Sequence, residues 1–218
     1  MKLIFVLFLF LFSISITIKI LPQSLVNEQS LQKFEVSVGF GSGTAFENDI
    51  FKTEIEKVKA SPEAIINFAM HYIIDPNLSF GFLLEGYTQT VGDVAVTLPS
   101  GELKNETFDL ACINIGVDGR WTFSRGSFEP YGFASINLVN GTLQNNFLGN
   151  LSMTGVSIGG GLGTKLNFSQ HWAVAIEAIG FLGTAKWKQK VFTNSTGTSF
   201  NPSHAGLTLA IVYRWGDM

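Results

Sequence analysis

Bulky apolar residues alternate with small or polar ones along much of the chain. The last such segment carries a large apolar side chain at every second position, namely Leu207, Leu209, Ile211, Tyr213 and Trp215. A period of two is typical of a β-strand whose two faces lie in different surroundings. The same pattern, interrupted by turn-forming residues, predicts eight strands at residues 33–42, 64–74, 78–90, 107–122, 128–140, 153–167, 171–183 and 204–215.

The connections between these predicted strands alternate in length. The short ones contain Pro, Asn, Ser or Gly, which favour tight turns, and lie at 75–77, 123–127 and 168–170. The long ones span 43–63, 91–106, 141–152 and 184–203. Transmembrane β-barrels combine short periplasmic turns with long extracellular loops. The alternation therefore predicts an all-β fold, an eight-stranded antiparallel up-and-down transmembrane β-barrel with both termini in the periplasm.

The two faces of the predicted strands differ in size as well as in polarity. Eight strands enclose a lumen just wide enough for packed side chains, whereas bulky apolar side chains suit lipid. The large apolar residues are therefore assigned outward, and the small and polar ones inward. Opposite charges enclosed in the lumen should pair, because an unpaired buried charge is costly, so a plugged lumen is favoured over an open one. The predicted polar network of the lumen comprises Glu35, His71, Glu85, Asn114, Asp118, Arg120, Lys165, Glu177 and Arg214.

Aromatic residues gather near the predicted periplasmic strand ends, where amphipathic rings favour the membrane interface. They are Tyr72, Trp121, Tyr131, Trp172, Tyr213 and Trp215. The fifth predicted strand fits the pattern less well. Assigning Tyr131 and Phe133 to lipid places Ser135 and Asn137 on the lipid side too, which predicts a bulge or a loop entry near Ala134.

The first residues predict export. Lys2 precedes an apolar run over residues 3–12, and Ser13 and Ser15 then supply small side chains, as in a secretory signal peptide. Apolar character continues around Lys19, so cleavage can fall as late as Ser24. The predicted organisation is a signal peptide at 1–24 and a barrel domain at 33–215. An uncleaved anchor is the alternative, whereas a lipoprotein anchor is excluded because no Cys follows the apolar run.

Composition narrows the function classes. Charged residues make up 14% of the chain, while Gly occupies 23 positions and Phe 20, a profile that favours strands over helices. The net charge of -3 and the lack of a basic stripe argue against nucleic acid as a partner. Cys112 is the single cysteine, which excludes an intramolecular disulfide and a cysteine-cluster metal site. We expect its thiol to be inert and inside the barrel.

Three stretches resemble the small bacterial outer-membrane β-barrels of the opacity, OmpX and OmpW types. They are the entry to the fifth predicted strand at 129–134, the glycine run at 159–163 with Lys165 and the turn at 169–172, and the aromatic end of the last strand. The resemblance covers residues 33–215 and implies the outer membrane as the location. It also implies that Tyr213 and Trp215 form the recognition signal for the outer-membrane assembly machinery, although residues 216–218 follow where the family often stops at Phe.

Candidate catalytic and metal-binding chemistry is sparse. Some eight-stranded barrels are lipid A deacylases, with a Ser two residues after the catalytic His, but the residues in that position after His71, His171 and His204 are Ile73, Ala173 and Gly206. No His or carboxylate pair has ligand spacing on one element, so no metal and no cofactor are predicted. The glycine run lacks the Lys-Ser/Thr ending of a phosphate loop and is interpreted as a close-packed lumen wall.

These features predict a non-enzymatic outer-membrane protein whose four outer loops serve surface interaction, adhesion or envelope integrity, with an unknown extracellular ligand. The predicted partners are outer-membrane lipid and lipopolysaccharide, whose phosphates could contact the alternating Lys186, Lys188 and Lys190. A narrow porin-like channel for small hydrophobic or ionic solutes is the alternative. A soluble lipocalin-like carrier is a third, and it requires the large apolar side chains to point inward.

Overall fold

The computed structural model describes residues 32–45, 59–60, 63–97, 101–145, 149–187 and 199–217. The predicted signal peptide at 1–24 lies outside the described residues. No helix within these ranges is long and apolar enough to cross a membrane.

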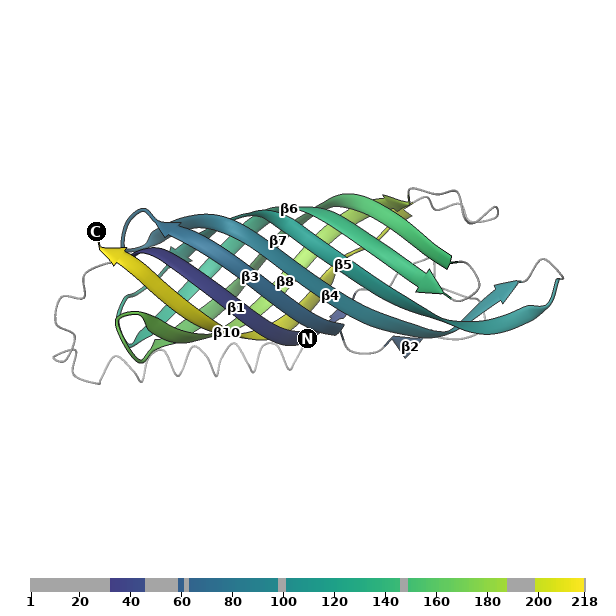
Figure 1. The fold of residues 1–218 in the computed structure, drawn as a ribbon, viewed down its shortest axis with the longest axis horizontal. Helices are drawn as coiled ribbons and strands as arrows, with labels where there is room; N and C mark the ends of the chain where they lie inside the picture. Colours follow the sequence, from purple (N-terminus) through teal and green to yellow (C-terminus); the bar gives the residue numbers. More distant parts are fainter. Residues whose placement is uncertain are drawn as a thin grey trace. The chain divides into compact units, whose positions relative to one another are not determined.

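Eight long strands make up the barrel (Figure 1), and each lies antiparallel to its neighbours. The last strand, β10, pairs with both β8 and β1, so the sheet closes on itself. The predicted eight-stranded all-antiparallel barrel is thus confirmed. The strands are β1 (Gln32–Ala45), β3 (Glu63–Ile73), β4 (Leu78–Thr97), β5 (Leu103–Thr122), β6 (Phe128–Asn145), β7 (Gly149–Asn167), β8 (Trp172–Trp187) and β10 (His204–Asp217).

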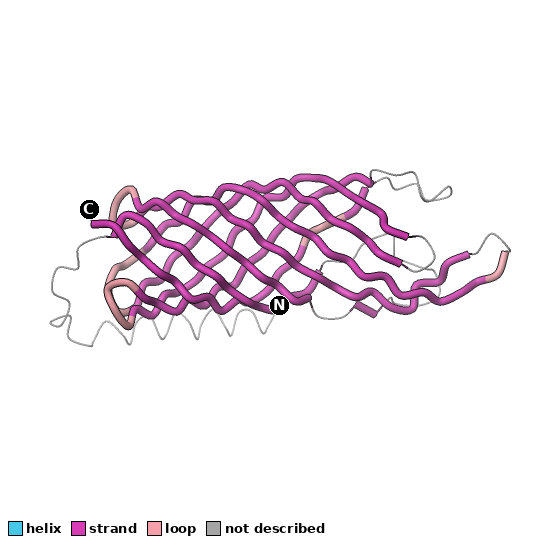
Figure 2. The backbone as a smooth tube through the Cα atoms, in the orientation of Figure 1, coloured by secondary structure: helices cyan, strands magenta, loops and turns pink. Residues whose placement is uncertain are grey.

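Two further strands are short. β2 (Lys59–Ala60) pairs with β4 and β9 (Ser199–Phe200) pairs with β8, both at the end of the barrel that carries the long connections. At the opposite end, Gln32 at the start of β1 lies beside Asp217 at the end of β10. Figure 2 shows the strands, drawn in magenta, running around the whole barrel. The two ends of the barrel domain therefore meet on the side of the short turns.

Two of the predicted long loops are largely strand. β4 and β5 stay paired out to Thr97 and Leu103, and β6 and β7 stay paired out to Asn145 and Gly149. Strand pairing satisfies backbone groups that a long loop would leave to water or to side chains. In Figure 1 the β4–β5 hairpin reaches well beyond the other strands. The predicted loops at 91–106 and 141–152 are therefore corrected to extended hairpins.

The outer face of the barrel is apolar. Large aliphatic side chains on it are 57% to 68% exposed, among them Val117, Ile136, Leu138, Ile158, Leu182 and Leu209. Their chain neighbours, such as Asp118, Asn137 and Thr208, are buried in the lumen. The assignment of these large residues to the outside is correct. A soluble carrier with large apolar side chains inside does not fit this surface, because so much exposed apolar area needs lipid around it.

The prediction for β6 is wrong. Its pairing is regular through Ala134, which lies opposite Gly119 on β5 and Gly160 on β7, so no bulge reverses the faces. Tyr131 therefore points inward with Ser135 and Asn137, and its side chain is fully buried. Gly163 on β7 makes the room: a Cβ there would lie 2.6 Å from Tyr131 Cζ. Gly161 gives Phe133 space in the same way, with a Cβ 2.7 Å from Phe133 Cε1.

The interior is divided into two layers along the barrel. Near the short turns lies a set of buried charged residues that we call the ionic layer: Glu35, Arg120, Glu129, Lys165, Glu177 and Arg214. Toward the long connections lies a cluster that we call the apolar layer: Ile65, Ala69, Leu83, Tyr87, Phe108, Leu110, Cys112, Leu143, Leu151, Met153, Ile179, Phe181 and Ala185. The prediction of a small and polar lumen therefore holds for one half only. Cys112 is buried in the apolar layer, as expected.

Candidate functional site: the ionic layer of the lumen

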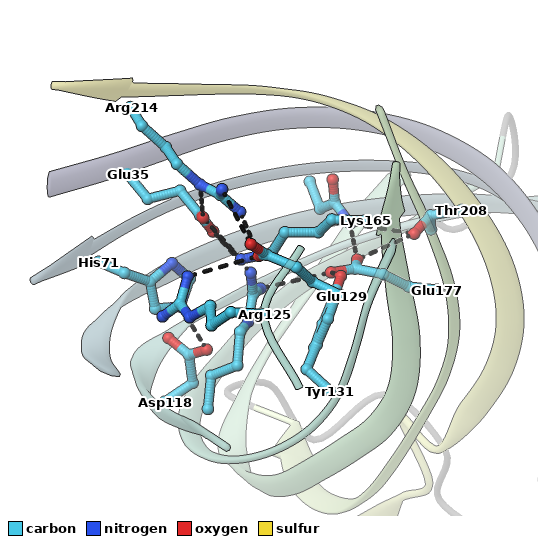
Figure 3. Close-up of polar contacts among 12 residues, drawn as sticks. Glu35, His71, Asp118, Arg125, Glu129, Tyr131, Lys165, Glu177, Thr208 and Arg214 are labelled. Atoms are coloured by element: carbon cyan, nitrogen blue, oxygen red, sulfur yellow. Dashed lines mark hydrogen bonds and ion pairs between the residues drawn. The ribbon is translucent and has the colours of Figure 1, made fainter. Parts of the chain in front are cut away.

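Glu35 on β1 is the centre of the ionic layer (Figure 3). Its two carboxylate oxygens accept hydrogen bonds from Lys165 Nζ at 2.7 and 2.6 Å, from Arg214 Nε at 2.9 Å and from Arg120 Nη1 at 2.9 Å. The three cations come from β7, β10 and β5. A buried carboxylate with several charge-assisted donors is held in one position, because each donor compensates part of the cost of desolvation.

Two more carboxylates extend this arrangement on either side of Glu35. Glu129 accepts from Arg214 Nη2 at 2.7 Å and contacts Arg125 Nη1 at 3.4 Å, near the turn end of the barrel. Glu177 accepts from the Tyr131 hydroxyl at 2.5 Å, from Thr208 Oγ1 at 3.1 Å and from Arg120 Nη2 at 3.3 Å. The charged side chains thus form one connected network across the lumen.

Tyr131 adds an aromatic wall to the network. The Arg120 guanidinium carbon lies 4.4 Å from the centre of the Tyr131 ring, and Lys165 Nζ lies 5.1 Å from it. Both distances permit cation–π attraction. Each of the two cations therefore has a carboxylate on one side and a ring face nearby.

Two histidine–carboxylate pairs lie at different heights in the lumen. His71 Nε2 is 2.7 Å from Asp118 Oδ2, next to the ionic layer. His204 Nε2 is 2.9 Å from Glu85 Oε1, which also accepts from Asn114 Nδ2 at 3.0 Å.

The His204 ring is held between two aromatic rings of the apolar layer. Its centre lies 4.2 Å from that of Tyr87 and 4.9 Å from that of Phe181. The second histidine pair is therefore enclosed by apolar side chains, whereas the first adjoins other charges.

All nine residues of the predicted lumen network are buried, and each makes at least one of these contacts. Sequence reasoning missed Glu129, Tyr131, His204 and Thr208. Glu129 and Tyr131 share a face with Ser135 and Asn137, and that small polar pair was the available signal for the orientation of β6. His204 is the first residue of β10 and shares a face with Gly206 and Thr208, so the alternation of this strand was the available signal for it.

Little space remains between the two layers. A cavity lined by Ser37, Asn67, Glu85, Asp118, Arg120 and Phe181, among others, has a volume of ≈ 10 Å³. A volume of this size admits about one water molecule. The charged groups below it and the rings above it obstruct the lumen at this level.

On the outer surface, aromatic rings form a continuous row at the turn end. Phe34 contacts Tyr72 on one side and Trp215 on the other, at 5.4 and 5.5 Å between ring centres. Tyr213 lies 5.9 Å from Trp215 and 4.7 Å from Trp172, which continues the row across β10 to β8. Tyr131 is not part of this row, because its side chain is inside.

Of the three lysines predicted to contact lipopolysaccharide, the structure describes one. Lys186 is exposed and lies near the end of β8, where it pairs with Ser199 of β9. Lys188 and Lys190 lie outside the described residues. Among the residues that the structure describes, no group of three or more His, Cys, Asp or Glu side chains is placed to hold a metal ion.

Comparisons with known proteins place the fold. No protein-family model matches the chain, and no curated protein matches it by sequence. Among solved structures, Neisserial surface protein A has a TM-score of 0.53 at 15% identity, over 84% of this chain and 97% of that one. OprG, an outer membrane protein from Pseudomonas aeruginosa, has a TM-score of 0.53 at 11% identity, over 86% of this chain and 100% of that one.

The chain has the fold of the small outer-membrane β-barrels. At these identities the similarity concerns the fold alone, and it covers 84% to 86% of this chain.

Proposed function

We propose that this chain is a non-enzymatic outer-membrane protein, a barrel with a closed lumen that presents its outer hairpins and loops for surface interaction, adhesion or envelope integrity. The observation that carries the proposal is the filled interior. Glu35 and its three cations block the turn end, and the apolar layer fills the loop end. A barrel built this way anchors its outer connections and offers no continuous water path for ions.

Membrane location follows from the outer face. The exposed aliphatic belt suits lipid, and the aromatic row at the turn end suits one membrane interface. We place the short turns and both ends of the barrel domain in the periplasm, with Tyr213 and Trp215 as the signal read by the assembly machinery. The test is fractionation of cells, with folded and heat-denatured samples compared by gel migration. Recovery in the soluble fraction without detergent would contradict the proposal.

Planar-bilayer recording tests the closed lumen. We expect the purified barrel to give no steady single-channel events, because the charged groups and the rings leave a cavity of only ≈ 10 Å³ at mid-lumen. Steady conductance would instead favour the narrow-channel alternative. A double variant, Arg120→Ala with Glu35→Ala, serves as the comparison. It removes two interlocking side chains and should raise conductance in a correctly folded barrel.

Contact with lipopolysaccharide through Lys186, Lys188 and Lys190 is part of the same proposal. Alternating lysines near the end of β8 would present ammonium groups to lipid phosphates. A variant with all three changed to Ala should bind lipopolysaccharide more weakly and with less dependence on salt. Unchanged binding would remove these residues from the proposed surface.

A further inference from the structure

A hollow lies on the outer wall of the barrel, over β4 and β5. Its volume is ≈ 350 Å³, near the lower limit of the roughly 300–1,000 Å³ usual for small-ligand pockets. Its lining comprises Ala64, Thr88, Gln89, Thr90, Asp109, Leu110, Ala111 and Gln144. Of these, Gln89 and Leu110 point into the lumen, so their outer surface here is mainly backbone.

The rim of the hollow toward the long connections is polar. Thr90, Asp109 and Gln144 are direct partners in the register across β4, β5 and β6, so their side chains stand in one row on the outer face. Side chains in such positions are about 4.5–5.5 Å apart at Cβ. The Thr90 hydroxyl donates to Asp109 Oδ1 at 2.9 Å, which fixes the orientation of the carboxylate.

The floor of the hollow is made of small side chains. Ala64, Thr88 and Ala111 form the next row in the register, one step toward the short turns. The hollow exists because two of these three positions are alanine.

One row below the floor of the hollow, the outer face is apolar. In the following row Gly86 lies between Ile66 and Ile113, which are 56% and 47% exposed. A Cβ at Gly86 would meet its nearest neighbour, the Cys112 carbonyl oxygen, only at 3.9 Å, so the surface above Gly86 is open. One row further, Leu84 between Phe68 and Ile115 closes this groove. The polar pocket thus borders a short apolar groove, the gap over Gly86 between Ile66 and Ile113.

We propose that this hollow binds the sugar headgroup of a membrane glycolipid, with one acyl chain lying in the groove over Gly86. Sugar hydroxyls both donate and accept, and they match a row that offers a hydroxyl, a carboxylate and an amide. Among the lining residues that the structure describes there is no Lys or Arg, and Asp109 is the one charged residue, which disfavours a phosphate headgroup. The groove accommodates the apolar half of the ligand. A free sugar has no acyl chain and would leave the groove empty.

This inference rests on the proposed membrane location, since the hollow stands where the apolar belt gives way to polar side chains. It adds a ligand class to the proposed function. It also separates this face from Lys186 near the end of β8, which suits phosphates rather than neutral sugars.

The test is native mass spectrometry of the folded barrel released from nanodiscs that contain a monoglucosyl diacylglycerol, phosphatidylglycerol and phosphatidylethanolamine. We expect the wild type to retain the glucosyl lipid in preference to both phospholipids. Ala111→Phe fills the floor and should abolish this preference. Asp109→Ala should lower retention about tenfold, the usual effect of losing a hydrogen bond to a charged group.

The matched control is Ala178→Phe, the same change at an exposed alanine on β8. It should leave retention unchanged. Equal retention of all three lipids by the wild type, or a preference for phosphatidylglycerol, would overturn the proposal.

Two further results would also overturn it. One is equal loss of retention in the two phenylalanine variants. The other is binding of free glucose as strong as that of the glucosyl lipid, which would assign the hollow to a soluble sugar. Each variant is first checked for the shift in gel migration between folded and heated samples. A failure of the membrane location would appear in that check and in fractionation, whereas a failure of the sugar site would appear in lipid retention alone.

Discussion

The two layers of the lumen fill the same kind of space by opposite means. The ionic layer places Glu35 among three cations and adds Glu129 and Glu177 around them. The apolar layer packs Phe108, Leu143 and Phe181, and its rings enclose the His204–Glu85 pair. Apolar packing tolerates the loss of one side chain at the cost of a cavity, whereas a buried ion network leaves an uncompensated charge when one partner is removed. The two halves should therefore respond differently to single substitutions.

The largest effect is expected from Glu35→Gln. It leaves Lys165, Arg120 and Arg214 close together without their shared carboxylate, and breaking a buried ion pair costs about 3–5 kcal/mol. Urea unfolding in lipid vesicles measures the change in free energy of unfolding, and bilayer recording should show added conductance. The control is Glu106→Gln in the extended β4–β5 hairpin, which should change the free energy of unfolding far less and leave the conductance unchanged. A stable, non-conducting Glu35→Gln barrel would contradict the central role of this carboxylate.

The apolar layer is tested by Leu143→Ala. Leu143 is 1% exposed, and Leu→Ala in a packed core costs about 2–5 kcal/mol, mostly through the cavity left behind. Stability should fall while conductance stays near that of the wild type, because the ionic layer still closes the lumen. If Leu143→Ala conducted as well as Glu35→Gln, the claim that the ionic layer by itself closes the lumen would be wrong.

A smaller effect is expected where the ionic layer meets the barrel wall. Gly163→Ala would bring a Cβ within 2.6 Å of Tyr131 Cζ, and overpacking of this kind costs about 1–3 kcal/mol. Gly180→Ala is the matched control, since a Cβ at Gly180 meets nothing within 4 Å. The difference between the two variants in urea midpoint measures the fit of the Tyr131 ring. Equal midpoints would mean that Tyr131 moves aside freely.

The smallest effect concerns a charge pair outside both layers. In the β4–β5 hairpin, hydrogen bonds from Lys104 and Asn145 lower the pKa of the Glu106 carboxyl. A carboxyl with a lowered pKa stabilises the fold above its ordinary value and loses this contribution as the pH falls through the lowered pKa. Lys104→Ala should return the Glu106 pKa toward its ordinary value, as measured by NMR titration. Ion pairs near the surface contribute little to stability, so the change in the free energy of unfolding should be smaller than in the other variants.

The number and order of the strands were predictable, and so was the inward or outward direction of many side chains. The reason is that alternation identifies a strand between two different environments. Where the lumen is polar, as around Glu35 or Glu177, the contrast with outward aliphatic residues is clear in the sequence. Where the lumen is apolar this contrast is lost. Around Cys112 of β5 the outward neighbours Ala111 and Ile113 are apolar too, and around Phe108 the contrast is reversed, because Thr107 and Asp109 are outside. The alternation there does not show which side chains are inside.

Tyr131 illustrates a second limit. A tyrosine near a strand end suits the membrane interface and a buried hydrogen bond equally well. Its orientation depends on a glycine of the adjacent strand, Gly163, and on an acceptor from the strand beyond, Glu177. Such partners are distant in sequence, so they become visible only when the register of the strands is known. The extended β4–β5 and β6–β7 hairpins were not predicted for a similar reason. Their residues form strands because they pair with each other, not because of their residue types.

The position of Glu35 on the first strand also affects how the chain folds. Its partners lie 85, 130 and 179 residues further along the chain, on β5, β7 and β10. Contacts of such sequence separation form slowly, because long loops must close first. Until β10 docks against β1, Glu35 lacks Arg214 and two strand edges remain unpaired. Pairing of β1 with β10 and completion of the charge network are therefore one event. We expect assembly to be cooperative and intermediates that lack β10 to be short-lived.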